Sequence, residues 1–115
     1  MGLEFGITEL GLTERIEFFR TLASWLTSGG GAFPVNEGIA NTCDVYSRDE
    51  YKSLRAKMER VVRDVNSGQV LFADALKATN LGFTAQELSI IRAAEESNQL
   101  RVAVPSLVEA LTMRQ

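Results

Sequence analysis

The chain has 115 residues, of which 45% are hydrophobic and 23% charged, and its formal net charge is −3 with a pI of about 5.0. These values fit one small globular domain with a single core, and they exclude an intrinsically disordered chain. The 12 Lys and Arg residues are interspersed with 15 Asp and Glu residues. The chain therefore lacks the clustered basic patch that nucleic-acid binding requires.

The available residue types restrict the chemistry. The single cysteine, Cys43, excludes an internal disulfide bond and fits a reducing compartment. No apolar run approaches the ~20 residues that cross a bilayer, and no signal-peptide pattern is visible. We expect residues 1–12 to form an N-terminal tail, in which Met1–Phe5 resembles an expression-vector remnant, and residues 13–115 to form a single helical domain.

Apolar residues repeat at spacings of three and four, which is typical of amphipathic helices. A first helix is predicted from Glu14 to Ser28, with Thr13 as its N-cap. Its buried stripe comprises Ile16, Phe18, Phe19, Leu22, Ala23, Trp25 and Leu26. Glycines 29–31 end this helix, because glycine accepts a left-handed backbone. A second helix is predicted from Pro34, with an inner face of Val35, Ile39, Cys43 and Tyr46.

The next three helices have start and stop signals. Ser47–Glu50 has the S-x-x-E spacing of a capping box and predicts a third helix that ends at residues 66–68. Its apolar face is Tyr51, Leu54, Met58, Val61, Val62 and Val65. A short fourth helix is predicted from Leu71 to Thr79. A second capping box, Thr84–Glu87, predicts a fifth helix with an apolar stripe of Leu88, Ile91 and Ala94.

The segment after residue 100 is ambiguous. Residues 101–104 have a strand-like composition, and Pro105 would disturb a helix interior. Because two-residue alternation occurs nowhere else and a lone strand is unstable, we expect a helix from Pro105 to Met113, with an optional first turn from Leu100. Short connections between helices predict an all-α fold, an antiparallel six-helix bundle.

Two carboxylates, Glu95 and Glu96, end the fifth predicted helix before the polar corner Ser97–Gln99. Carboxylates near a helix C-terminus oppose the helix dipole, so a further role is expected. In the favoured interpretation, one of them accepts hydrogen bonds from backbone N–H groups of the corner, to which Ser97 belongs. Contact with a partner and metal binding are the alternatives, although two carboxylates supply too few oxygen ligands for calcium.

Three further groups have a structural and a functional interpretation. Arg20 is expected either to pair with Glu17 or Glu95 or to face a partner. Large apolar residues are expected in the core, namely Phe18, Trp25 and Phe72, whereas an exposed Trp25 would indicate a subunit interface. The third predicted helix has a basic face, which is either solvated or binds anionic lipid or an acidic partner; it comprises Arg48, Lys52, Arg55, Lys57, Arg60 and Arg63.

The sequence favours neither an enzyme nor a cofactor-binding protein. The chain has no histidine, the commonest general base, and Cys43 therefore lacks the partner that would activate it. Glycines 29–31 are not followed by the Gly-Lys-Ser/Thr of a phosphate-binding loop. No catalytic residue and no cofactor are predicted.

Four stretches match a known pattern in order. Residues 18–29 follow F-x-R-Q-L-A-x-L-L-x-A-G with Thr21 in place of glutamine, Trp25 in place of a leucine and Ser28 in place of alanine. The middle of the pattern is matched by Val65, Gly68 and Ala75–Leu76. Phe83 precedes the fifth helix, and residues 93–100 match the corner A-G-E-x-S-G-x-L at Ala93, Glu95, Ser97 and Leu100, with Ala94 and Asn98 in place of its glycines. Together they resemble the soluble domain of the inner-membrane platform proteins of bacterial type II secretion systems and type IV pili.

The resemblance implies a function. Platform proteins lie in the bacterial inner membrane with helical domains on the cytoplasmic side, where they face a hexameric assembly ATPase and support pilin or pseudopilin assembly. This chain would be the first cytoplasmic domain, a non-catalytic scaffold that transmits motion from the ATPase, with a homodimer among the expected assemblies. The resemblance favours a type IV pilus, of the type IVb branch, over secretion.

Two other classes of function compete with the platform interpretation. One is a free-standing soluble helical adaptor or regulator that docks a partner helix in a groove. The other is a DNA-binding helical domain that uses Thr84–Ala94 for recognition; the acidic residues Glu87 and Glu95 count against it.

Overall fold

The computed structural model describes residues 9–115, so the origin of Met1–Phe5 lies outside the described residues. Within this range the chain forms six α-helices and no strand, which confirms the all-α prediction. The helices are α1 (Leu12–Thr27), α2 (Val35–Asp44), α3 (Lys52–Asn66), α4 (Phe72–Ala78), α5 (Ala85–Glu96) and α6 (Leu100–Thr112).

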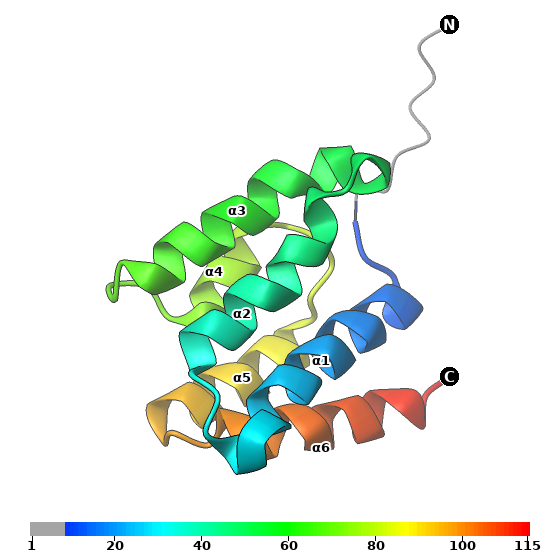
Figure 1. The fold of residues 1–115 in the computed structure, drawn as a ribbon. Coiled ribbons are helices and arrows are strands. Elements are labelled where there is room, and N and C mark those ends of the chain that lie inside the picture. The colour runs from blue at the N-terminus through cyan, green and yellow to red at the C-terminus, as the bar shows by residue number, and fades with distance from the viewer. Residues whose placement is uncertain (1–8) are drawn as a thin grey trace, which may run out of the picture.

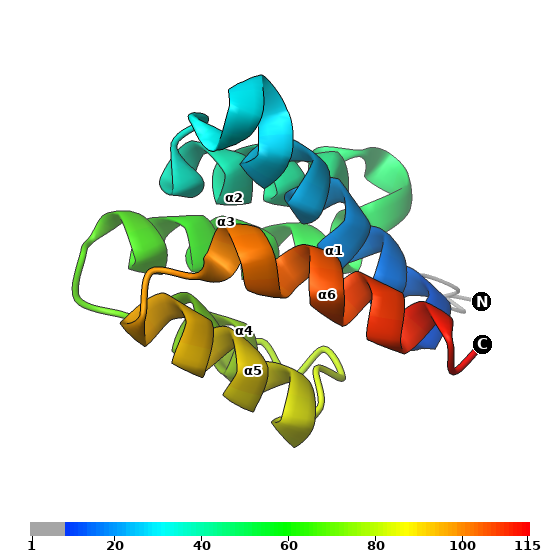
Figure 2. The same cartoon turned by 90° about the horizontal axis from the view of Figure 1, so that it is seen from below.

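The helices form a bundle in which each packs against the next, and α6 returns to pack against α1 (Figure 1). Seen from below, α6 lies between α1 and α5 (Figure 2). The first and last helices of the described chain are therefore neighbours. The α1–α6 contact is the most extensive between any two elements. Residues far apart in sequence therefore close the bundle.

The core is apolar and its largest side chains are aromatic. Phe18 and Phe72 are each 1% exposed, as predicted. Phe18 meets Phe83 edge to face, with ring centroids 5.4 Å apart, a favoured aromatic geometry. Trp25 is only partly buried, which corrects its assignment to the core. Its ring packs at the edge of the bundle against Phe33, with centroids 5.0 Å apart.

The start of α1 differs from its prediction. Thr13 lies inside the helix, and the N-cap is Gly11, whose N–H donates to the Glu14 carboxylate at 3.0 Å. The predicted tail includes Leu10, yet Leu10 is 2% exposed and its N–H donates to the Leu81 carbonyl at 2.6 Å. The packed domain therefore begins before residue 13.

The connection from α1 to α2 confirms the predicted glycine break. Ser28–Gly31 forms a 3-10 turn, with φ values of 61° at Gly29 and 71° at Gly30. These left-handed conformations are accessible to glycine without a steric penalty. Pro34 is the N-cap of α2 rather than its first helical residue.

The predicted capping box at Ser47–Glu50 does not form. The chain instead makes two short 3-10 turns, Val45–Ser47 and Asp49–Tyr51, and α3 begins only at Lys52. The Ser47 hydroxyl donates back to the Asp44 carbonyl at 2.8 Å, so it serves the end of α2 instead of the start of α3. The second box is confirmed: Glu87 N–H donates to the Thr84 hydroxyl at 3.1 Å, and Thr84 N–H donates to the Glu87 carboxylate at 3.0 Å.

Helix α6 begins at Leu100, so the optional first turn of the prediction forms, and the strand-like residues 101–104 are helical. Its buried residues follow helical spacing against the core, namely Leu100, Val104, Leu107 and Leu111. Burial of this stripe outweighs the one hydrogen bond that Pro105 cannot donate inside the helix.

Candidate functional site

The corner between α5 and α6 is the region that the sequence marks most strongly. Asn98 adopts a left-handed conformation, with φ of 58°, and lets the chain reverse in few residues. The Ser97 hydroxyl donates to the Ala93 carbonyl at 2.9 Å, and Gln99 N–H donates to the Ala94 carbonyl at 2.7 Å. These bonds satisfy carbonyls at the end of α5, so Ser97 has a structural role at the corner.

Glu95 reaches away from the corner, to the start of α4. Its carboxylate accepts hydrogen bonds from the backbone N–H groups of Phe72, at 2.6 Å, and Ala73, at 2.9 Å. The prediction that a carboxylate caps backbone N–H groups thus holds for Glu95, but the capped groups belong to another helix. The predicted capping of the corner itself is wrong for Glu95, because the corner is closed by Ser97, Asn98 and Gln99.

The chemistry of α4 explains this long-range cap. Its own N-cap residue, Leu71, has no side-chain acceptor, and no side chain from within α4 caps its first N–H groups. A carboxylate from α5 satisfies those donors and lies at the positive end of the α4 dipole. The favourable interaction with the α4 dipole offsets the unfavourable interaction of Glu95 with the C-terminal end of the α5 dipole. Glu95 therefore ties the α5–α6 corner to α4.

Glu96, the other carboxylate of the pair, is exposed. Within residues 9–115, no three His, Cys, Asp or Glu side chains gather closely enough to hold a metal ion. The structure therefore separates two adjacent residues that the sequence treats as a pair: Glu95 is engaged internally and Glu96 faces solvent.

Arg20 forms an ion pair with Glu17 on the same face of α1. Both side chains are more than half exposed, at 51% and 60%, so this pair contributes little to stability. Of the two predicted internal partners, the structure selects Glu17, because Glu95 is committed to α4.

The basic residues of the third predicted helix divide into two groups. Three have carboxylate neighbours at nitrogen–oxygen distances of 3.4–3.8 Å: Arg48 with Glu50, Arg55 with Asp49, and Arg60 with Asp64. Among the described residues, no carboxylate lies within ion-pair distance of the other three, Lys52, Lys57 and Arg63. Arg48 precedes α3, and the remaining five basic residues lie within it.

A buried ion pair that the sequence reasoning missed connects α1 to α5. The Arg15 guanidinium Nε lies 3.0 Å from the Glu87 carboxylate, and the two side chains are 13% and 2% exposed. A second guanidinium nitrogen of Arg15 donates to the Leu10 carbonyl at 3.1 Å. The only sequence signal at Glu87 was its capping box, which gives no hint of a partner 72 residues away.

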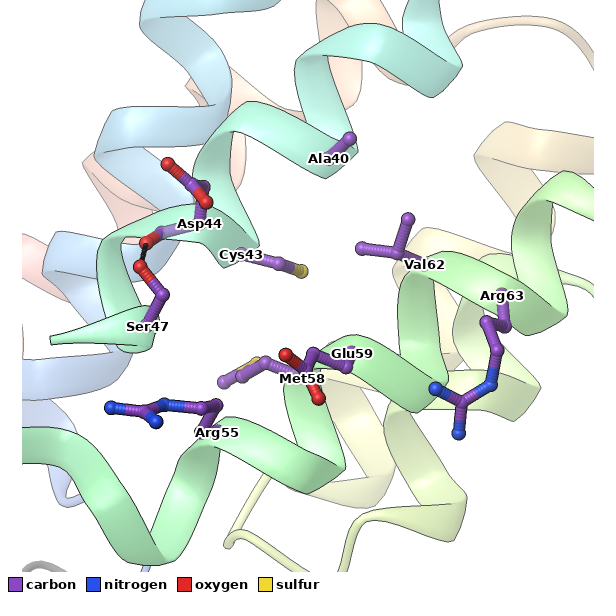
Figure 3. Close-up of a pocket in the computed structure, with 9 residues that line it drawn as sticks. All are labelled: Ala40, Cys43, Asp44, Ser47, Arg55, Met58, Glu59, Val62 and Arg63. Carbon is purple, nitrogen blue, oxygen red and sulfur yellow. Dashed lines mark hydrogen bonds between the residues drawn. The ribbon is translucent and has the colours of Figure 1, made fainter.

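A hollow lies between α2 and α3 (Figure 3). This α2–α3 groove has a volume of about 530 Å³ and is lined by Ala40, Cys43, Asp44, Ser47, Arg55, Met58, Glu59, Val62 and Arg63. In Figure 3, Cys43 of α2 and Val62 of α3 point toward each other, with Arg55 and Arg63 along the α3 side. Sequence periodicity marked Cys43 and Met58 as core, and it gave no indication that a groove opens above them.

Cys43 lies at the floor of the α2–α3 groove and is 4% exposed. Burial raises the pKa of its thiol to about 12, because removal from water disfavours the thiolate. At neutral pH the side chain is therefore a protonated thiol, a small and largely apolar group.

None of the helices in residues 9–115 is long and apolar enough to cross a membrane. Comparison of the chain with protein-family models, curated proteins and solved structures found no match.

Proposed function

We propose that this chain is a non-catalytic scaffold domain of an inner-membrane assembly platform for type IV pili or type II secretion. In this role it lies on the cytoplasmic side, receives motion from a hexameric assembly ATPase and passes it to the assembly of pilin or pseudopilin subunits. The proposal includes an antiparallel order of neighbouring helices, which their short connections favour. A type IV pilus, of the type IVb branch, is the preferred machine.

The observation that supports this proposal is the α5–α6 corner. Asn98, which stands at a glycine of the platform pattern, has φ of 58°, a conformation that glycine adopts freely. Glu95, the glutamate of the same pattern, accepts two backbone hydrogen bonds from α4. The residues on which the resemblance depends therefore have physical roles in an all-helical domain of this type.

The test is the size and location of the parent protein. An antibody raised against this chain is used on separated membrane and cytosolic fractions of the native organism. A band several-fold larger than 12.7 kDa in the inner-membrane fraction supports the platform proposal. A soluble band near 12.7 kDa contradicts it.

The second candidate is a free-standing soluble helical adaptor. The α2–α3 groove favours this class, because a groove with an apolar floor can hold a partner helix whether or not the parent protein is in a membrane. A soluble band in the fractionation experiment would select the adaptor.

A further inference from the structure

The floor of the α2–α3 groove is apolar and its depth has a structural cause. Ala40 and Cys43 contribute small side chains from α2, and Met58 and Val62 contribute apolar side chains from α3 (Figure 3). Because alanine and cysteine do not fill the space between the two helices, a hollow of about 530 Å³ remains at the surface. Such a hollow accepts apolar side chains from outside and removes them from water.

The rim of the groove is charged unequally. Helix α3 carries five basic and two acidic residues, a net charge of +3 in a chain whose net charge is −3. On the groove side, Arg63 has no carboxylate within ion-pair distance among the described residues. The α2 side presents the carboxylate of Asp44. On the α3 edge Arg55 and Arg63 flank one carboxylate, Glu59, so this edge has a net charge of +1, whereas the α2 edge carries the carboxylate of Asp44.

The Arg55 side chain is held in place beside the groove. Its terminal nitrogen lies 3.4 Å from Asp49, while its Nε is buried without a hydrogen-bond partner among the described residues. Because Nε is closed off from solvent, an acceptor that arrives from outside meets the terminal nitrogens of this guanidinium. An incoming carboxylate near the α3 edge would find both Arg55 and Arg63.

We propose that the α2–α3 groove binds an amphipathic helix of a partner protein, with its apolar ridge on the groove floor and Asp or Glu side chains against the α3 edge. This inference rests on the proposed scaffold function in one respect, namely that the partner is a protein. Helix-in-groove docking uses apolar anchors at i, i+3, i+4 and i+7, and charges beside them set the orientation.

A protein helix fits the groove better than an anionic membrane does. A membrane binds protruding apolar side chains, whereas the apolar groups here lie at the bottom of a hollow. Glu59 and Asp44 also line the groove and would repel a surface that is anionic throughout, whereas a helix can place its Asp or Glu side chains beside Arg55 and Arg63 alone. A helix can direct different side chains to the two edges and so satisfy both.

The test is selection from a displayed library of amphipathic helices of about 18 residues, roughly 27 Å long. Apolar residues are fixed at i, i+3, i+4 and i+7, and the flanking positions vary among Glu, Lys, Gln and Ser. We expect enrichment of Glu on one flank. Amide shifts of the labelled protein on binding should map to Ala40, Cys43, Met58 and Val62.

Matched variants test the site itself. Ala40→Phe fills the groove and should abolish binding of the selected peptide, whereas Ala56→Phe, on an exposed position of α3 outside the groove, should not. Arg63→Glu should weaken binding about tenfold or more, and Lys57→Glu less than about twofold. Unchanged thermal unfolding would show that each variant is folded.

Several results would overturn the proposal. They are a library that yields no binder, enrichment of basic or uncharged flanks, or peptide binding that survives Ala40→Phe. Binding to vesicles of phosphatidylserine and phosphatidylcholine that is lost in Arg63→Glu would assign the edge to lipid instead. If the selection fails but fractionation finds the parent protein in the inner membrane, only the groove proposal is refuted. If the selection succeeds but the parent protein is small and soluble, only the platform proposal is refuted.

Discussion

Removing the Glu95 carboxylate should destabilise the domain, because it leaves the first N–H groups of α4 without an acceptor. Side-chain caps contribute about 0.5–2 kcal/mol, and hydrogen bonds to a charged group about 1.5–3 kcal/mol each. Glu95 makes two such bonds, at 2.6 and 2.9 Å. Removal of the Glu95 side chain would open the adjacent hollow of about 500 Å³, which Leu71 and Glu95 line, toward these donors. Water can then replace part of the lost bonding, so we expect a loss near the upper end of the capping range, below the sum for two bonds to a charged group.

We therefore expect Glu95→Ala to lower the free energy of unfolding by about 2 kcal/mol, or the melting temperature by about 8 °C. Glu95→Gln keeps one acceptor oxygen and should lose about half as much. Thermal and urea unfolding followed by circular dichroism measure both. Hydrogen exchange at the Phe72 and Ala73 amides should accelerate more than exchange in α1.

Glu96→Ala is the matched control, because Glu96 is the adjacent carboxylate and is exposed. Its effect should stay within about 0.5 kcal/mol. Equal stability of Glu95→Ala and Glu96→Ala would refute the capping of α4 by Glu95.

Two further variants test buried groups. Arg15→Ala should lower the free energy of unfolding, measured in urea, by about 3 kcal/mol, because it leaves the Glu87 carboxylate, 2% exposed, without its cation. The double variant Arg15→Ala with Glu87→Gln should be more stable than Arg15→Ala alone. A wild-type unfolding curve for Arg15→Ala would contradict this reasoning. Burial raises the pKa of Cys43 from 9.0 to about 12, so as the pH rises the thiol ionises in the unfolded chain before it ionises in the folded one. The contribution of the buried thiol to the free energy of unfolding is therefore complete below pH 9 and is lost between about pH 9 and about pH 12. Urea unfolding at about pH 8 and about pH 10 should show a smaller decline for Cys43→Ala than for the wild-type chain, and parallel declines would refute the assignment.

Several elements could be predicted because their signals are local. The stripe of Leu54, Met58, Val61 and Val65 defines one face of α3 through spacing alone. The Thr84–Glu87 box forms as predicted because both partners lie within one turn. The break at residues 29–31 follows from the conformational freedom of glycine.

The errors occur where a local signal competes with distant packing. Ser47 has the spacing of a capping residue, but its hydroxyl bonds back to Asp44 while Tyr46 and Tyr51 pack together, with centroids 5.0 Å apart. Pro105 suggests a helix start and makes the turn from Leu100 optional, yet that turn is helical, because the buried stripe begins at Leu100. In both cases burial against other elements outweighs the propensity of a single residue.

The sequence by itself determined that this chain is helical and where most helices break, because periodicity and breakers act within a few residues. Tertiary structure decided what the polar groups do: Glu95 caps a helix more than 20 residues away, and Glu87 pairs with Arg15 across the bundle. It also decided that α2 and α3 leave a groove between them. These features depend on the spacing and rotation of whole helices, which are set only when the apolar stripes of all six pack into one core.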